Sequence, residues 1–136
     1  KVVMNEGAGL RLLVSRVQQT VDRAQAHPAL VAPALDLQRA SALIASVTQQ
    51  AWACGSAPEV LANATPYLQG FGHWVLAWMW LDVVAADQGH DVHDATRGRM
   101  SAMRYFYAYE LPKIEPWLAV VARREDVCRS IHPEWF

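Results

Sequence analysis

The stretch ANATPYLQGFGHWVLAWMWLDVVAA, residues 62–86, is the most apolar part of this chain and decides its fold. It places Trp74, Trp78 and Trp80 within a short span of a 136-residue chain whose formal net charge is only −1. A segment of this kind crosses a membrane, holds a ligand, forms a core, or faces something outside the chain. The spacing of its side chains discriminates among these possibilities.

A membrane span is the least favoured of the four. A membrane-spanning helix needs about 20 predominantly apolar residues. The run over residues 67–86 is interrupted by Gln69, His73 and Asp82 and contains two glycines. We therefore expect no transmembrane span.

A packed helix is the better interpretation. One apolar stripe follows helical spacing, and it consists of Tyr67, Phe71, Trp74, Trp78, Leu81 and Ala85. Leu76, Trp80 and Val83 form a second stripe on another face. Burying one large aromatic side chain removes about 200 Å² from water, or about 5 kcal/mol gross, whereas Gly70 and Gly72 cost only about 2 kcal/mol against alanine. The segment is therefore predicted to pack on two sides, one in a helical core and one against a partner.

The rest of the chain also has helical spacing, without a convincing strand pattern. The first stripe is Leu10, Leu13, Val14, Val17, Val21 and Ala24, the second Leu37, Ala40, Ile44, Val47, Ala51 and Cys54, and the last Met100, Met103, Tyr107, Leu111, Ile114, Leu118 and Val121. His27-Pro28 should end the first helix and Gly55 the second. Ser56 and Glu59 fit a capping box, and Asp94 is expected to cap the last helix.

Prolines interrupt two of these helices. Pro66 lies about ten residues into the third helix, where a kink or a restart is expected with Thr65 as a second N-cap. Pro112 and Pro116 should bend the fourth. We predict one all-α domain over residues 1–136, an antiparallel up-and-down four-helix bundle with proline-kinked third and fourth helices.

Composition narrows the possible partners. Charged residues make up 18% of the chain and hydrophobic residues 53%, whereas about 25% of an average soluble domain is charged. Part of the surface is therefore expected to be covered in the working molecule. No basic patch is present, which argues against nucleic-acid binding.

Cys54 and Cys128 have no metal-ligand spacing; two ordinary thiols are favoured, with a disulfide as the alternative. No signal-peptide pattern is visible, and we expect a cytoplasmic protein.

Two groups of polar residues are candidates for a ligand or metal site. Gln69 and His73 form a polar strip on an apolar helix, and a hydrogen-bonded structural histidine is favoured over a ligand. The loop GHDVHD over residues 89–94 carries His90 and His93 and could hold a divalent ion, but a polar connector is favoured. The helices have no Glu-x-x-His pair for a di-iron site. The sequence predicts no metal site. It contains no nucleophile elbow, phosphate-binding loop, dinucleotide fingerprint or haem attachment motif.

The stretch RYFYAYELP, residues 104–112, carries four aromatic rings, those of Tyr105, Phe106, Tyr107 and Tyr109. Aromatic packing is the favoured interpretation. The alternative is an apolar ligand held between these rings and the tryptophan helix, which would make the chain a stand-alone helical binding module.

Two motifs carry a resemblance to a known family. LANATPYLQGFG, residues 61–72, followed by RYFYAYELP, resembles the extra C-terminal domain of a bacterial subgroup of acyl-CoA dehydrogenases, those similar to methylthiopropanoyl-CoA dehydrogenase. The opening KVVMNEGAGLRLLVSRV, residues 1–17, is similar to the segment that follows the dehydrogenase body in those proteins. The resemblance implies a parent flavoenzyme that uses FAD and a glutamate base to form an α,β-unsaturated acyl-CoA.

The same resemblance implies that this chain has no catalytic or cofactor-binding residue of its own, because the flavin and the base belong to the body. It implies an accessory or assembly domain whose partners are that body and further copies of the enzyme. The alternative remains a module that binds an apolar ligand or a partner protein. The expected docking positions are Thr65, Pro66, Tyr67, Phe71, His73, Trp74, Trp78, Trp80, Tyr105 and Tyr109.

Overall fold

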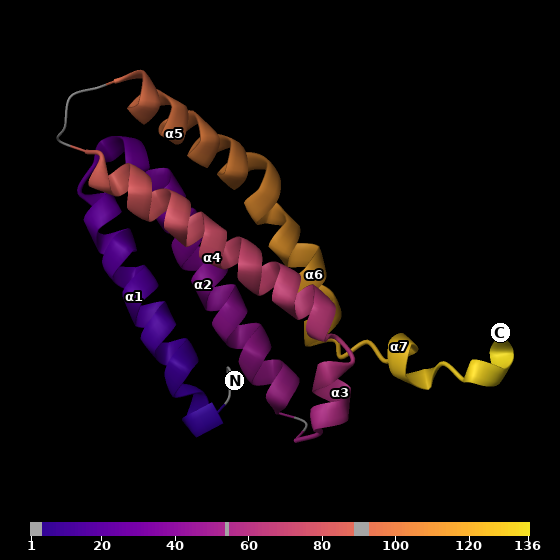
Figure 1. Cartoon of the computed structure of the whole chain (residues 1–136). Helices are drawn as coiled ribbons and strands as arrows, with labels where there is room; N and C mark the ends of the chain where they lie inside the picture. Colours follow the sequence, from indigo (N-terminus) through magenta and orange to yellow (C-terminus); the bar gives the residue numbers. More distant parts are fainter. Residues whose placement is uncertain (1–3, 54, 89–92) are drawn as a thin grey trace.

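The computed structural model describes residues 4–53, 55–88 and 93–136, and it is helical throughout, without a strand in these ranges (Figure 1). The helices are α1 (Ala8–Gln25), α2 (Val31–Trp52), α3 (Ala57–Leu61), α4 (Ala64–Ala86), α5 (Asp94–Tyr105), α6 (Ile114–Ala122) and α7 (Val127–Ser130). The all-α prediction is confirmed for the described residues. Four long segments, α1, α2, α4 and α5–α6, pack together, and α3 and α7 are short.

The ends of the first two helices follow the local signals in the sequence. Helix α1 stops just before His27-Pro28, and α2 stops just before Gly55. Gly55 has a φ of +69°, a left-handed conformation that glycine adopts without a steric penalty, and its N–H donates to the carbonyl of Trp52 at 3.1 Å.

The start of α4 differs from the prediction. The chain does restart, but two residues earlier than expected, because Asn63 is the N-cap residue and Thr65 lies within the helix. Pro66 is therefore the third residue of α4 and causes no kink in its interior. The first N–H groups of a helix have no intrahelical acceptor, so a proline there loses no hydrogen bond.

The last predicted helix is interrupted and not only bent. Helix α5 begins at Asp94 with His93 as its N-cap residue, and it ends at Tyr105. A π-helical turn (η3, Phe106–Glu110) and a 3-10 turn (η4, Leu111–Lys113) then lead to α6. Pro112 lacks the N–H that would continue the helical ladder, and Pro116 falls in the first turn of α6. The predicted proline interruption is thus confirmed.

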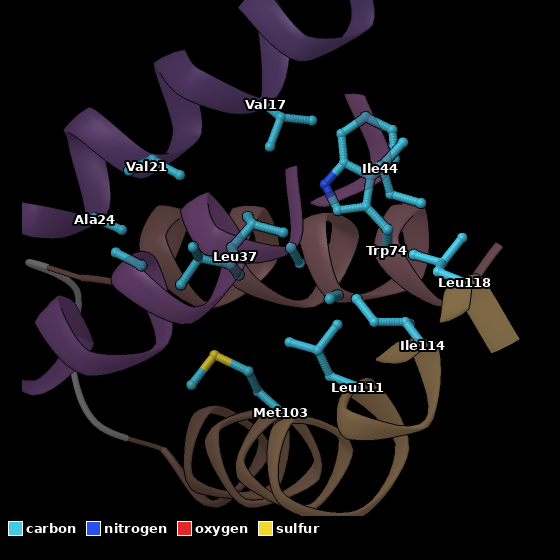
Figure 2. Close-up of a cluster of buried hydrophobic side chains, with 14 of the residues drawn as sticks. Val17, Val21, Ala24, Leu37, Ile44, Trp74, Met103, Leu111, Ile114 and Leu118 are labelled. Atoms are coloured by element: carbon cyan, nitrogen blue, oxygen red, sulfur yellow. The ribbon is translucent and has the colours of Figure 1, made fainter. Parts of the chain in front are cut away.

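Helices α2 and α4 form the centre of the molecule. Helix α1 packs against both on one side, and α6 packs against both on the other (Figure 1). Figure 2 shows core side chains from all four long segments converging between them. The labelled members of this core are Val17, Val21, Ala24, Leu37, Ile44, Trp74, Met103, Leu111, Ile114 and Leu118. Each of them is at most 5% exposed.

One helical segment of the described chain, residues 28–52, is long and apolar enough to cross a membrane by length and composition. This segment includes α2, whose Leu37 and Ile44 are fully buried in the core. Core helices of globular proteins have the same length and composition, so the observation is weak evidence for a span.

Candidate docking surface

Helix α4 buries one apolar face and exposes another. Its outward residues Leu68, Leu76, Met79 and Val83 are 69%, 45%, 54% and 44% exposed. They step along the helix by multiples of three and four residues and therefore lie on one face. We call these four residues the outer stripe. Gly72 lies between the first two, and a Cβ added there would meet nothing within 4 Å.

Trp74 belongs to the core and not to the outer stripe. Its side chain is 0% exposed, and its indole Nε1 donates to the hydroxyl of Ser41 at 2.9 Å. Ser41 in turn donates to the carbonyl of Leu37 at 2.9 Å. Phe71 meets the indole edge-on with a ring separation of 5.3 Å. The expectation that Trp74 contacts a partner is therefore corrected, because the bundle already surrounds it.

Trp78 joins α4 to α1. Its indole Nε1 donates to Thr20 Oγ1 at 2.9 Å, and the same hydroxyl donates to Asp82 Oδ1 at 2.8 Å. Arg23 forms an ion pair with Asp82. Trp80 is half-buried and packs against the core. Trp78 and Trp80 thus lie between the buried face and the exposed face of α4. Each ring is half-buried by contacts with other residues of this chain.

The positions at the start of α4 are mostly internal as well. Thr65 is exposed and Pro66 is half-buried. The Tyr67 hydroxyl lies 2.7 Å from Thr48 Oγ1, and because Thr48 donates its single proton to Ile44 O, Tyr67 must be the donor. Burial raises the pKa of Tyr67. Phe71 is half-buried between Tyr67 and the core.

His73 is a fixed structural histidine. Its Nδ1 lies 3.0 Å from the carbonyl oxygen of Gln69, and its Nε2 lies 3.5 Å from Glu110 Oε2. The Trp117 ring meets it edge-on at 4.8 Å. Glu110 also accepts from Lys113 Nζ at 2.7 Å, and this hydrogen bond, followed by the contact with His73, holds the pKa of Glu110 below its ordinary value. The imidazole therefore links α4 to the π-helical turn.

Within the described residues no group of three or more histidine, cysteine or acidic side chains could hold a metal ion. Residues 89–92 of the GHDVHD loop lie outside the described residues, His90 among them, whereas His93 and Asp94 are exposed. Cys54 also lies outside the described residues, and Cys128 is an exposed free thiol.

The four rings after Arg104 divide between the inside and the outside. Tyr107 donates from its hydroxyl to the carbonyl of Ala77 at 3.0 Å, and Phe106 packs near His73 with a ring separation of 5.8 Å. Tyr105 and Tyr109 are 59% and 64% exposed, and their rings lie 4.9 Å apart. The inner two rings fill the contact with α4, and the outer two add an exposed aromatic pair to the surface.

Sequence reasoning found part of this surface. It predicted a second apolar stripe through Leu76, Trp80 and Val83, whereas the structure exposes Met79 in place of Trp80 and adds Leu68. The four-residue spacing from Leu68 through Gly72 to Leu76 is a signal that could have identified Leu68 as a member of the stripe.

The described surface includes two hollows that are lined neither by residues of α4 nor by the exposed tyrosines. The larger is an open groove of about 1200 Å³ between α1 and α2. The smaller, of about 290 Å³, lies between α2 and the η4–α6 segment. The groove is lined by Leu10, Val14 and Trp52 with glutamines at its sides, and it contains no glycine-rich loop for a pyrophosphate.

Comparison with known proteins identifies the family. The family model described as acetyl-CoA dehydrogenase C-terminal like matches residues 13–132. No curated protein and no solved structure matches the chain. Because the matched residues include all four long helical segments almost completely, the chain belongs to the acyl-CoA dehydrogenase C-terminal-like family.

Proposed function

We propose that this chain is the accessory domain of an FAD-dependent acyl-CoA dehydrogenase of the methylthiopropanoyl-CoA dehydrogenase-like subgroup. The domain performs no catalysis and supports assembly by packing the outer stripe of α4 on the dehydrogenase body of the same polypeptide. The observation that carries this proposal is the exposure of four large apolar side chains on a rigid helix. Contiguous apolar patches on monomeric proteins are typical of interaction sites.

The energy of the outer stripe favours a tethered partner. Fully burying a leucine, valine or methionine contributes about 1.5–3 kcal/mol, and these four residues are about half exposed, so covering them contributes about 3–6 kcal/mol gross. Free association costs about 4–15 kcal/mol in lost rotation and translation. A partner on the same polypeptide avoids most of this cost, because a linker holds the two surfaces at a high effective concentration.

The remaining features fit the same assignment. The flavin and the glutamate base belong to the dehydrogenase body, which supplies the redox chemistry. We take the four long segments as an antiparallel up-and-down bundle that serves as a rigid platform for the outer stripe. We further place the enzyme in the cytoplasm as a homo-oligomer without nucleic-acid or membrane partners.

The first test is the native gene product. Its coding sequence upstream of Lys1 is read, and the purified protein is examined by absorbance spectroscopy before and after addition of acyl-CoA. We expect an extended chain with a flavin spectrum that bleaches on addition of the thioester. A colourless native chain that begins near Lys1 would overturn the dehydrogenase assignment.

The second test addresses docking within that full-length enzyme. Met79→Arg places a charge in the outer stripe, and Leu12→Arg places the same charge on α1, where Leu12 is 74% exposed and lies outside the stripe. We expect Met79→Arg alone to separate the thermal unfolding of this domain from that of the flavin-containing body. Equal behaviour of the two variants would contradict the docking role while leaving the family assignment intact.

A further inference from the structure

The outer stripe of α4 has a regular spacing that restricts the shape of its partner. Starting from the half-buried Gly72, steps of four, three, four and three residues lead to the exposed positions Leu76, Met79, Val83 and Ala86. Alternating steps of three and four residues repeat every seven residues and form a nearly straight seam along a helix. Two helices pack along such a seam with their axes about 20° apart.

The seam is long and narrow. Leu68 and Ala86 lie 18 positions apart, so the seam runs for about 27 Å. Asp82 borders it on one side and forms an ion pair with α1, and Asp87 borders it on the other side and forms an ion pair with α5 (Figure 1). A helix about 10 Å wide that crossed α4 steeply would leave most of this length uncovered. A helix inclined by about 20° covers most of it.

Gly72 leaves a gap in the seam, which we call the notch. A Cβ added at Gly72 would meet nothing within 4 Å, and Leu68 and Leu76 lie about one helical turn away on either side. The inner face of α4 shows what a glycine permits. Leu118 of α6 packs on Gly70, where an added Cβ would lie 3.0 Å from the Leu118 Cγ. The notch would admit a large side chain of a partner helix in the same way.

We propose that the element of the dehydrogenase body that covers the outer stripe is an α-helix running along α4 at about 20°, with a large apolar side chain in the notch. This inference rests on the proposed function and names the element of the body that makes the contact. The partner helix carries apolar residues at steps of three and four, and these fill the spaces between Leu76, Met79 and Val83.

The area of the stripe favours a tethered helix over a second free copy of this chain. The four side chains of the stripe are about half exposed, and their exposed parts amount to on the order of 200 Å² of apolar surface. A specific interface between free proteins buries about 800 Å² on each partner. A helix of the same polypeptide needs less area, because the linker keeps it at a high effective concentration.

Photo-cross-linking in the full-length enzyme tests the geometry. The photoreactive residue p-benzoylphenylalanine replaces Leu76 in one variant and Val83 in another, and mass spectrometry identifies the cross-linked peptides. The two positions lie about 10.5 Å apart along α4, so we expect them to react with a single helix of the body at sites about seven residues apart. The control is the same replacement at Leu12 of α1, which is 74% exposed and should give no cross-link to that helix.

A matched pair of glycine variants tests the notch. Gly72→Leu fills it, whereas Gly98→Leu adds the same side chain on α5, where an added Cβ also meets nothing within 4 Å. Overpacking at the contact should raise hydrogen exchange in the cross-linked body helix about 5- to 150-fold for Gly72→Leu. Gly98→Leu should leave this exchange unchanged, and equal exchange in the two variants would overturn the notch contact.

The outcomes separate this inference from the proposed function. Cross-links from only one of the two stripe positions, or to two unrelated segments of the body, would overturn the helical geometry even if Met79→Arg detaches the domain. Cross-links to α4 of another copy would overturn the choice of partner. Absence of any cross-link to the body, together with unchanged thermal unfolding of Met79→Arg, would contradict docking itself.

Discussion

Leu118 of α6 packs directly on Gly70 of α4, so closely that a Cβ added to the glycine would lie 3.0 Å from Leu118 Cγ and Cδ2. Leu118 is fully buried and has little room to shift. The glycine therefore permits the close approach of α4 and α6. Gly72, two residues along the same helix, has open space at the equivalent position.

These two glycines predict opposite effects of the same substitution. Gly72→Ala should stabilise the chain by about 0.5–1 kcal/mol, because alanine favours the helix. Gly70→Ala should destabilise it by about 1–2 kcal/mol, since overpacking a core costs about 1–3 kcal/mol and exceeds the helical gain. Urea unfolding followed by tryptophan fluorescence measures both. Stabilisation by Gly70→Ala would show that α6 can move away at no cost.

Trp74 should be the most costly residue of α4 to remove. Trp74→Ala leaves a large cavity between the helices and is expected to lower the free energy of unfolding by about 3–5 kcal/mol. Met79→Ala on the outer stripe is the control and should change it by no more than about 0.5 kcal/mol. The same urea titration provides the values. Similar losses in the two variants would be inconsistent with a core assignment for Trp74.

Glu110 should make the fold sensitive to acid. The hydrogen bond from Lys113, followed by the contact with His73, holds the pKa of Glu110 in the folded chain below the ordinary 4.5. The unfolded chain therefore binds more protons in this range, and the stabilisation present above about pH 4.5 is lost as the pH falls through the folded pKa. Glu110→Gln should lose less stability than the parent between pH 6 and pH 3. Parallel pH profiles, measured by thermal unfolding, would argue against this contribution.

Tyr107 should make the fold sensitive to alkali. Burial, with a smaller effect of Asp36, raises the pKa of Tyr107 far above its ordinary value of 10.0. Because the folded chain keeps this proton while the unfolded chain releases it, stability should fall as the pH rises above about 10. Tyr107→Phe should show a shallower decline between pH 9 and pH 11 than Tyr109→Phe, although it loses the hydrogen bond to Ala77 O at all pH values. Identical slopes for the two variants would contradict the prediction.

Local signals in the sequence were sufficient for the helices themselves. Apolar residues at helical spacing identified all four long segments, and His27-Pro28 and Gly55 marked two of their ends because proline and glycine act on the backbone within a residue or two. Pro66 was harder to interpret. The same residue kinks a helix in its interior and is harmless in its first turn, and the boundary at Asn63 decides between the two.

The candidate docking surface was only partly predictable. Two apolar stripes on α4 were visible from spacing. For residues at the boundary between the stripes, however, the sequence did not show which face the core and which face outward. Trp74 and Trp80 were both expected to contact a partner, yet one is fully buried and the other half-buried. Met79, which was not expected, is more exposed than either.

The sequence by itself determined that the chain is helical, where its first two helices end, and that α4 carries more apolar surface than one core can bury. Helical periodicity and backbone chemistry are local and can be read from neighbouring residues. Only the tertiary structure decided which face of α4 stays outside, that Gly70 is covered by Leu118, and that His73 meets Glu110. These contacts join residues far apart in the chain, and they depend on how closely and at what rotation the helices pack, which no local pattern specifies.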